Sequence, residues 1–581
     1  MDPLSQLSEE TQKNVQAWLS GPFDLDTKNA IKDMISSNLE DVENSFYQHL
    51  SFGTAGLRGI MGPGPNRMNV YTVRQTTKGL ADYLKEQFPS SPIKVAVAYD
   101  SRHNSQLFAT ESARVLASAS IEVYLFKELR PTPLLSFACR HLKCNAAIMI
   151  TASHNPPEYN GYKVYWSDGG QILSPHDKGI TEKIEQAREG GRISITEPED
   201  PYIHIIGKEI DEAYLETIRP LSLWSEPDKS SLKVHFSPLH GTGATLMPQA
   251  LQDRGITTFS MVESQSTPDG NFPEASSPNP EVQETLQTGI NEMIEGNLDL
   301  FLATDPDADR LGVVVNHQGT PHILTGNQIA ALSTEWIFHQ LSSKGTLPPK
   351  PAVVKSIVTT PLVQKITEAY GGKCHNVLTG FKYIAKQILD WETGSDSENF
   401  VFGCEESYGY LFGSYARDKD AIGTGCLIAE IAWQMKQESK TLIDGLNDIW
   451  KQHGFYNETV INCAFGETKA GRERMAALME KLRSSPPKKF ASYNCIAVED
   501  MKTKQFTGDP SLQLGNDLPD ADAIIFTLED LSLVIFRPSG TEPKVKVYLM
   551  LAPPQSKGLE KAQEESHAKA EQLRAYIRKL T

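Results

Sequence analysis

The sequence predicts an α/β protein of several domains, with mainly parallel sheets in most of the chain. Short apolar runs alternate with longer helix-like stretches along most of the 581 residues, and this alternation is typical of parallel sheets covered by helices on both faces. A chain of 64.3 kDa is also too long for one hydrophobic core. From about residue 454 the pattern changes to alternating strands, which predicts a different last domain.

The expected elements follow from these runs. We expect strands at residues 93–99, 146–150, 298–303 and 352–355, and helices at residues 73–87 and 327–341. Residues 197–201 (EPEDP) have the composition of a linker, and Thr325 opens a further helical unit. The predicted domains are therefore residues 1–208, 209–324, 325–453 and 454–581.

The two ends of the chain differ from this pattern. Residues 531–535 and 545–549 alternate like strands of a half-exposed sheet. The amphipathic stretch 556–580 predicts a helix that packs on that sheet. The first fifty residues carry no recognisable motif, and we expect an extra helical cap on the first domain.

Composition excludes several classes of function. The formal net charge of −17 argues against nucleic acid and anionic membranes as general partners. Seven cysteines without a CxxC pair predict neither a disulfide framework nor a zinc site. With no signal peptide and no membrane-length apolar run, we expect a soluble cytoplasmic protein. An acidic protein with an anionic substrate must gather its lysines and arginines locally.

A polar loop with a serine follows the buried run 146–150. Residues 151–156 have the sequence TASHNP, and prolines at 156 and 157 hold the chain extended. Open α/β sheets place their chemistry in loops at the ends of such strands. A hydroxyl on a constrained loop is what a covalent phosphoryl or acyl carrier needs, so Ser153 is the candidate nucleophile. The alternative is ordinary turn chemistry.

A second loop, residues 305–310 (DPDADR), follows another apolar run. Alternate residues of an extended segment point the same way, so we expect Asp305, Asp307 and Asp309 to converge on one cation. Oxygen ligands suit a hard divalent ion, with Mg²⁺ the default where phosphate is also a ligand. Arg310 would offset the excess negative charge, and it excludes an EF-hand because it occupies the position of that motif's glycine. A solvated acidic turn is the alternative.

A third loop, residues 403–409 (GCEESYG), follows a strand-like run. Its acidic pair and hydroxyl between glycines, with Glu405 and Ser407 as candidates, would accept and donate hydrogen bonds to a polyol. The alternative is a glycine-bounded turn with an exposed acidic pair. Residues 417–420 (RDKD) follow, and Lys419 would bring a cation to the same substrate unless the run is simply solvated.

The fourth loop, residues 537–544 (RPSGTEPK), lies between two strands. Arg537 offers bidentate contacts, Ser539 and Thr541 offer hydroxyls, and Gly540 permits close backbone approach, which together favour phosphate binding. The loop lacks P-loop spacing, so nucleotide binding does not follow. A hairpin turn is the alternative.

In this order the four loops resemble those of the α-D-phosphohexomutases, the phosphoglucomutase and phosphomannomutase superfamily. The resemblance starts near Phe52 and includes residues 52–59 (FGTAGLRG), 160–163 (NGYK) and 379–382 (TGFK). Residues 59–69 resemble the larger branch that contains type-2 phosphoglucomutases. The resemblance implies a four-domain phosphohexomutase-like α/β architecture, with three related α/β domains and a smaller α+β C-terminal domain around a central cleft.

The resemblance also implies a reaction of two phosphoryl transfers. Phospho-Ser153 would pass its phosphoryl group to a hexose phosphate, form a bound 1,6-bisphosphate and take the other phosphoryl group back. Mg²⁺ would bind Asp305, Asp307, Asp309 and a phosphoryl oxygen on Ser153, with glucose 1,6-bisphosphate as intermediate and activator. Such a transfer depends on positioning and charge neutralisation more than on covalent chemistry.

The resemblance assigns further roles to single residues. Lys163 and Arg58 are the candidates for proton transfer and its support, and Lys163 would need a pKa lowered by its cationic surroundings. Simple phosphate binding is the alternative for Lys163, and His154 would orient the loop. The expected substrate contacts are Arg310, Lys382, Glu405, Ser407, Lys419, Arg537, Ser539, Gly540 and Thr541.

The sequence defines the substrate less sharply than it defines the type of reaction. Ser407 resembles the hexose form of the sugar loop, which favours glucose 1-phosphate and glucose 6-phosphate, with phosphomannomutase activity beside them. Phosphopentomutase and glucose-1,6-bisphosphate synthase activities of the same branch stay open. So do a catalytically silent phosphosugar-binding regulator and a metal-dependent phosphatase. The sequence gives no indication of oligomeric state.

Overall fold

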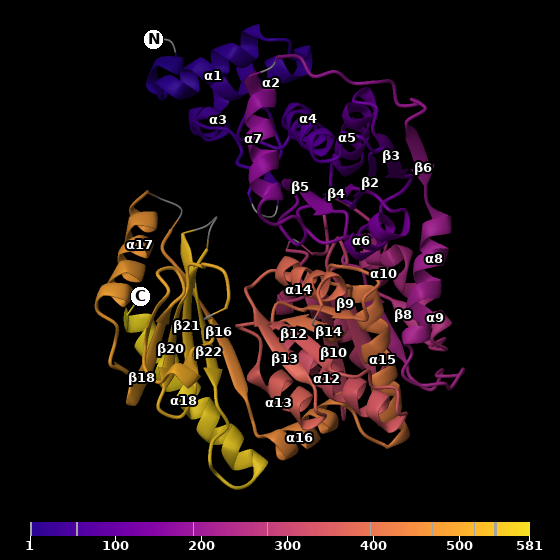
Figure 1. Cartoon of the computed structure of the whole chain (residues 1–581), viewed down its shortest axis with the longest axis vertical. Helices are drawn as coiled ribbons and strands as arrows, with labels where there is room; N and C mark the ends of the chain where they lie inside the picture. Colours follow the sequence, from indigo (N-terminus) through magenta and orange to yellow (C-terminus); the bar gives the residue numbers. More distant parts are fainter. Residues whose placement is uncertain are drawn as a thin grey trace. The chain divides into compact units, whose positions relative to one another are not determined.

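The structure is a computed structural model that describes residues 3–53, 56–189, 191–275, 277–395, 397–466, 469–515, 517–539 and 543–580. The chain divides into two compact units. Unit 1 comprises Met1–Ile323 and Leu411–Glu430, and unit 2 comprises Leu324–Tyr410 and Ile431–Thr581. Figure 1 shows helices and strands alternating along most of the chain, as predicted.

Three short helices precede the first sheet: α1 (Glu9–Ser20), α2 (Leu25–Ser37) and α3 (Leu39–Phe46). Ser8 and Asp24 cap the first two, each accepting a backbone N–H with its side chain. The Trp18 ring stacks on Phe23 at 4.2 Å and meets Tyr71 of the next helix edge-on at 5.7 Å. These contacts attach the N-terminal helices to the first α/β region.

The first sheet has six strands in the order β1-β5-β4-β2-β3-β6. Strands β4, β2, β3 and β6 run parallel, and β5 returns antiparallel beside β4. One face packs against α4, α5 and α7 in a single apolar cluster, and α6 packs against β2 and β4. The elements are β1 (Leu57–Ile60), α4 (Val70–Gln87), β2 (Lys94–Tyr99), α5 (Ser105–Ser118), β3 (Glu122–Phe126), α6 (Thr132–His141), β4 (Ala146–Ile150), β5 (Tyr159–Trp166), α7 (His176–Glu189) and β6 (Ile203–Ile206).

The second sheet of unit 1 has five strands in the order β11-β10-β9-β7-β8. Strand β9 runs parallel to β7 and antiparallel to β10. Leu286 and Ile290 of α11 pack with Phe301 of β9 in one apolar cluster. The elements are α8 (Lys208–Ile218), β7 (Val234–Ser237), α9 (Met247–Asp253), β8 (Phe259–Met261), α10 (Glu263–Ser266), α11 (Gln283–Glu295), β9 (Leu300–Thr304), β10 (Leu311–His317) and β11 (Thr320–Ile323).

The third sheet has the order β13-β12-β14-β15, and β12 runs parallel to both of its neighbours. The strand expected before the third loop (residues 403–409, called the sugar loop below) is longer than predicted. Strand β14 continues through the first residues of this loop as far as Glu405. The elements are α12 (Gly326–Ser343), β12 (Pro351–Ser356), α13 (Pro361–Ala369), β13 (Lys373–Val377), α14 (Phe381–Thr393), β14 (Asn399–Glu405), β15 (Gly409–Phe412), α15 (Ala421–Gln437) and α16 (Leu442–His453).

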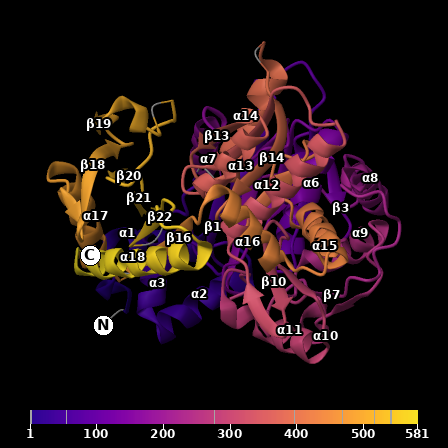
Figure 2. The same cartoon turned by 90° about the horizontal axis from the view of Figure 1, so that it is seen from below.

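The fourth sheet is antiparallel, in the order β16-β22-β21-β20-β18-β17, with β19 paired to β18. Figure 2 shows α17 and α18 beside it. The elements are β16 (Asn457–Ala464), α17 (Lys469–Ser484), β17 (Lys489–Phe490), β18 (Tyr493–Asp500), β19 (Gln505–Thr507), β20 (Ile524–Leu528), β21 (Leu533–Pro538), β22 (Lys544–Leu551) and α18 (Leu559–Leu580).

The prediction of a half-exposed last sheet is wrong for its central strands β21 and β22, because both of their faces are covered, whereas β16 keeps an exposed face. Along β21, Val534 points into a cluster with α17 and α18, whereas Ile535 packs in a second cluster that includes Ile357 and Leu378. The face expected to meet water therefore packs on residues from the third-sheet region of the same unit.

Candidate active site

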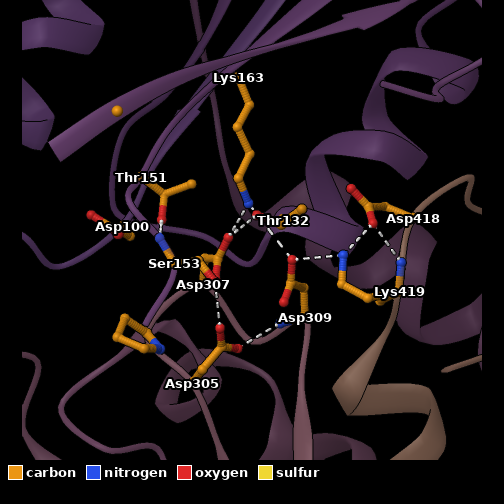
Figure 3. Close-up of polar contacts among 12 residues, drawn as sticks. Asp100, Thr132, Thr151, Ser153, Lys163, Asp305, Asp307, Asp309, Asp418 and Lys419 are labelled. Carbon is orange, nitrogen blue, oxygen red and sulfur yellow. Dashed lines mark hydrogen bonds and ion pairs between the residues drawn. The ribbon is translucent and has the colours of Figure 1, made fainter. Parts of the chain in front are cut away.

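The serine loop lies at the carboxyl end of β4. Ser153 has a φ of 53°, a left-handed conformation that is unusual for a residue with a side chain. Its Oγ donates to Asp305 Oδ2 at 2.9 Å and lies 3.1 Å from His154 Nδ1, while its N–H donates to Thr151 Oγ1 at 2.8 Å. Figure 3 shows this hydroxyl beside the acidic loop. A backbone held in this way presents a single hydroxyl in a fixed direction.

Asp305, Asp307 and Asp309 lie together, as predicted, but not on an extended segment. The N–H of Ala308 donates to the carbonyl of Asp305 at 2.9 Å, and the φ of Ala308 is 52°, so the loop is a tight turn. Asp305 Oδ1 accepts the N–H groups of Asp309 and Arg310, each at 3.0 Å. The turn, rather than strand alternation, brings the three carboxylates to one point.

These carboxylates fit a hard divalent cation. One oxygen from each lies within 4.8 Å of the others, and all three residues are buried. Asp307 Oδ1 and Asp309 Oδ1 are buried and accept no hydrogen bond within the described part of the chain. Buried acceptors without a donor are costly unless a cation binds them, and an all-oxygen donor set is the one that Mg²⁺ prefers.

Two lysines contact the same carboxylates from different parts of the sequence. Lys163 Nζ, on β5, lies 2.8 Å from Asp307 Oδ2 and 3.6 Å from Asp309 Oδ2. Lys419 Nζ lies 3.0 Å from Asp309 Oδ2 and 2.9 Å from Asp418 Oδ1 (Figure 3). Residues 417–420 are all buried, so the alternative of a solvated charge run is wrong. The segment 411–430 belongs to the same unit as the serine loop.

Burial and the neighbouring charges shift the pKa values of these groups in different directions. Burial, reinforced by Asp307 and Asp309, raises the pKa of Asp305 well above its usual value. Burial acts in the same direction on Asp307, but Lys163 overcomes it and lowers the pKa of that carboxyl. Burial would lower the pKa of Lys163, yet Asp307 and Asp309 raise it. The lowered pKa expected for Lys163 is therefore not found, because its nearest neighbours are anions.

The other expected residues of this site lie around the loop. Arg58 Nη1 donates to Asn155 Oδ1 at 3.0 Å. Burial, together with Arg310 and Arg58, lowers the pKa of His154 well below its usual value, which favours a neutral ring beside Ser153. Arg310 pairs with Glu281, and its Nε lies 4.0 Å from Asp309 Oδ1.

Three groups at this site escaped the sequence analysis. Thr132 donates its hydroxyl to Asp307 Oδ2 at 2.8 Å, and Asp418 accepts from Tyr165 at 2.8 Å while holding Lys419. Arg102 lies beneath the serine loop and donates to its carbonyls. One sequence signal could have identified Arg102. It lies just after strand β2, in a loop at the end of the first sheet.

In unit 2 the sugar loop meets two neighbouring loops at the carboxyl ends of parallel strands. Glu405 Oε1 accepts the N–H of Gly380 at 2.6 Å, and Glu406 Oε2 accepts the Ser356 hydroxyl at 2.9 Å. Ser407 is half-buried in the following turn. Lys382, in the first turn of α14, lies with its Nζ 5.4 Å from the centre of the Tyr383 ring. Glu405, Glu406 and the Gly380 loop thus form one polar edge.

The phosphate-binding candidates lie at the end of the β21–β22 pair. Arg537 pairs in register with Lys546 on β22, and the N–H of Ser539 donates to the carbonyl of Lys544 at 2.8 Å. Gly540 and Thr541 lie outside the described residues. The Arg537 guanidinium and the Ser539 hydroxyl therefore both lie at the end of β21, and β22 begins at Lys544.

Comparisons with known proteins agree with this fold. Models of the phosphoglucomutase/phosphomannomutase α/β/α domains I, II and III match residues 49–190, 212–319 and 325–453. A phosphoglucomutase of Staphylococcus epidermidis (strain ATCC 12228) is 36% identical over 536 residues, which cover 91% of this chain and 96% of that protein. A phosphoglucomutase of Staphylococcus aureus (strain USA300) is 36% identical over 525 residues, covering 89% and 92%.

Solved structures support the fold. A putative phosphomannomutase from Thermus thermophilus superposes with a TM-score of 0.65 at 22% identity, covering 90% of this chain and 99% of that one. The open form of parafusin, a phosphoglucomutase from Paramecium, gives a TM-score of 0.63 at 16% identity, covering 92% and 96%. Both are similar to this chain in architecture.

Three α/β domains followed by an antiparallel sheet, with a serine loop beside an acidic triad, define a phosphohexomutase. The chain belongs to the phosphoglucomutase/phosphomannomutase family, an isomerase family of intramolecular phosphotransferases, which confirms the predicted fold class and family. Among the described residues, no helix is both long and apolar enough to cross a membrane.

Proposed function

We propose that the protein is a phosphoglucomutase that interconverts glucose 1-phosphate and glucose 6-phosphate through phospho-Ser153. The observation that carries this proposal is the position of Ser153 Oγ, 2.9 Å from Asp305 in a buried triad whose other members each keep a free oxygen. The 36% identity to phosphoglucomutases over most of the chain supports glucose phosphates as substrates. Mannose phosphate would be a second substrate, because it differs from glucose phosphate only at C2.

The acidic triad would serve as a magnesium site. Asp305, Asp307 and Asp309 would hold Mg²⁺, which when bound draws charge from a transferring phosphoryl group. The backbone N–H groups of Asp309 and Arg310 fix the orientation of Asp305, while Thr132 fixes Asp307. These contacts keep the carboxylates in place before any phosphoryl group arrives.

Lys163 would act in its protonated form. Its contacts with Asp307 and Asp309 favour the ammonium, which suits a phosphate contact and donation of a proton to the departing Ser153 oxygen. The proton lost by the attacking sugar hydroxyl would then return Lys163 to its ammonium form. Lys419 would add a second fixed cation at Asp309. Arg58 and Arg310 would balance the charge of the phosphoryl group, and His154 would orient the serine hydroxyl.

The remaining candidate substrate contacts lie in unit 2. Glu405, Ser407 and Lys382 would contact sugar hydroxyls, because carboxylate, hydroxyl and ammonium groups match a polyol. Arg537 and Ser539, with Gly540 and Thr541, would hold the distal phosphate. Glucose 1,6-bisphosphate would be both the bound intermediate and the activator that phosphorylates Ser153. The proposed setting is cytoplasmic carbohydrate metabolism.

The test is whether glucose 1,6-bisphosphate phosphorylates one serine. Purified protein would be incubated with the bisphosphate and Mg²⁺, and the modified peptide would be identified by mass spectrometry. We expect one phosphoryl group on Ser153, and none on the Ser153→Ala protein. Modification elsewhere, or steady release of inorganic phosphate as from a phosphatase, would contradict the proposal.

A further inference from the structure

The carbonyls of the serine loop converge on one buried arginine. The Arg102 guanidinium donates through Nη2 to the carbonyls of Ser153, at 2.6 Å, and of Asn155. Through Nη1 it donates to the carbonyls of Pro156, at 2.8 Å, and Tyr159, at 3.1 Å. One side chain thus satisfies four acceptors spread over seven residues, and its own side chain is fully buried.

Asp100 holds this arginine from the opposite side. Its Oδ2 lies 3.3 Å from Arg102 Nε, and its Oδ1 accepts the N–H of Arg102 at 3.0 Å and the hydroxyl of Ser105 at 2.7 Å. The carboxylate balances the charge of the guanidinium and fixes the plane of the fork. The Nη groups then point at the loop.

A turn from the second α/β region covers the guanidinium. The Phe272 ring centre lies 5.0 Å from Arg102 Cζ, a cation–π distance. The turn fits closely, because a Cβ on Gly270 would come within 2.6 Å of the His103 backbone nitrogen. His103 Nε2 also lies 2.8 Å from Asn271 Oδ1. Arg102 is therefore enclosed between its aspartate, the serine loop and this aromatic ring.

We propose that Arg102 is a positioning residue for phosphoryl transfer, which sets the left-handed conformation of Ser153 by holding the carbonyl of Ser153 and three carbonyls that follow it in the chain. The inference rests on the proposed function, since it concerns how Ser153 is presented to the substrate. Arg102 contacts the backbone carbonyls of this loop, so it acts on the Ser153 hydroxyl only through the backbone. Its effect should therefore appear in the rate of transfer more than in substrate affinity.

The four-way contact explains why the residue should be arginine. Guanidinium is planar and offers donors in a fixed fork, whereas a lysine ammonium is a single compact donor group. Lysine would keep the positive charge beside Asp100 but would not reach both pairs of carbonyls. Charge alone and the fork geometry can therefore be separated by substitution.

The experiment compares Arg102→Ala and Arg102→Lys with Arg254→Ala. Arg254 is a matched control because it is also buried, pairs with Glu430 at 2.8 Å and donates to the carbonyl of Ile218 at 2.6 Å. Single-turnover phosphorylation of Ser153 by glucose 1,6-bisphosphate and steady-state kcat and KM would be measured at a temperature where all variants are folded. The same rates would then be measured again with guanidinium chloride at millimolar concentration.

We expect Arg102→Ala to lose about 100-fold in kcat and in Ser153 phosphorylation, with KM nearly unchanged, because small misplacement of a reacting group has effects of that size. Guanidinium should restore part of the rate in a saturable way, and equal sodium chloride should not. Arg254→Ala should show neither the loss nor the rescue. Arg102→Lys should also lose rate and show faster amide hydrogen exchange in residues 153–159.

Wild-type rates in a folded Arg102→Lys protein would overturn the inference, and so would a loss that guanidinium leaves untouched in folded Arg102→Ala. If Arg102→Ala does not fold, Arg102→Lys alone decides between these results. Failure of the wild-type protein to phosphorylate Ser153 would instead refute the proposed function. The two failures are therefore distinguishable.

Discussion

Glu458 should make unit 2 less stable as the pH rises from about 4.5 towards 7. This residue lies near the start of β16 and lines a cavity of about 290 Å³ together with Thr360 and His567. Its Oε1 is buried and accepts no hydrogen bond within the described part of the chain. Burial raises its pKa from 4.5 to about 7, against the lowering effects of the Thr360 hydroxyl and Lys355.

The sign and size of the effect follow from these two pKa values. Between pH 4.5 and 7 the unfolded chain loses the Glu458 proton while the folded chain keeps it, so the free energy of unfolding falls as pH rises. Above about pH 7 the loss is complete and amounts to at most about 3 kcal/mol. Glu458→Gln removes the charge, and for a unit of this size each kcal/mol shifts the melting temperature by about 2–4 °C.

The assay is thermal melting of the wild type and Glu458→Gln at pH 5 and pH 8. We expect the difference in melting temperature, Glu458→Gln minus wild type, to be several °C larger at pH 8 than at pH 5. Glu499→Gln is the matched control, because both oxygens of Glu499 accept backbone N–H groups, from Leu514 and Gly515 at 2.9 Å each. That substitution should lower the melting temperature at both pH values. An equal difference between Glu458→Gln and wild type at pH 5 and pH 8 would refute the reasoning.

Three further outcomes test the site. Ser153→Ala should abolish turnover and leave the melting temperature near that of the wild type. Wild-type activity in the Ser153→Ala protein would contradict the assignment of Ser153 as the nucleophile. Asp307→Asn should weaken Mg²⁺ binding, measured by titration calorimetry, and lower kcat by at least about 10–100-fold, since even residues that only orient a metal ligand have effects of that size. Unchanged metal affinity would contradict the triad. Arg537→Ala should raise KM for glucose 1-phosphate about 10–100-fold, because charge-assisted hydrogen bonds contribute about 1.5–3 kcal/mol; an unchanged KM would refute the phosphate-binding role.

The sequence predicted the buried strands better than the polar ones. Residues 146–150 are five consecutive apolar side chains and form β4 with these bounds. The neighbouring strand β5 was missed because Asn160 and Lys163 interrupt its apolar pattern, and Lys163 is polar because it serves the site. Strand β6, at Ile203–Ile206, follows a polar stretch that resembles a linker. A strand that carries functional polar residues, or that lies at the edge of a sheet, therefore lacks the apolar pattern by which strands were predicted.

The candidate site was predicted where residue type alone defines the chemistry. Ser153 and the three aspartates were predicted because each group follows a buried strand, where open α/β sheets place their chemistry. Arg102 and Asp418 were missed because a charged residue in sequence looks solvated, and only the fold shows that it is buried and paired. The turn at Ala308 depends on a positive φ that no local pattern indicated.

In the proposed reaction, Ser153 carries a phosphoryl group between the two ends of one hexose phosphate. The most direct measurement is a coupled assay of glucose 1-phosphate conversion to glucose 6-phosphate, with Mg²⁺ and trace glucose 1,6-bisphosphate, beside mannose 1-phosphate and ribose 1-phosphate. We expect fast turnover of glucose 1-phosphate that depends on the bisphosphate and is lost in Ser153→Ala. No turnover of glucose 1-phosphate by protein that is phosphorylated on Ser153 would contradict it.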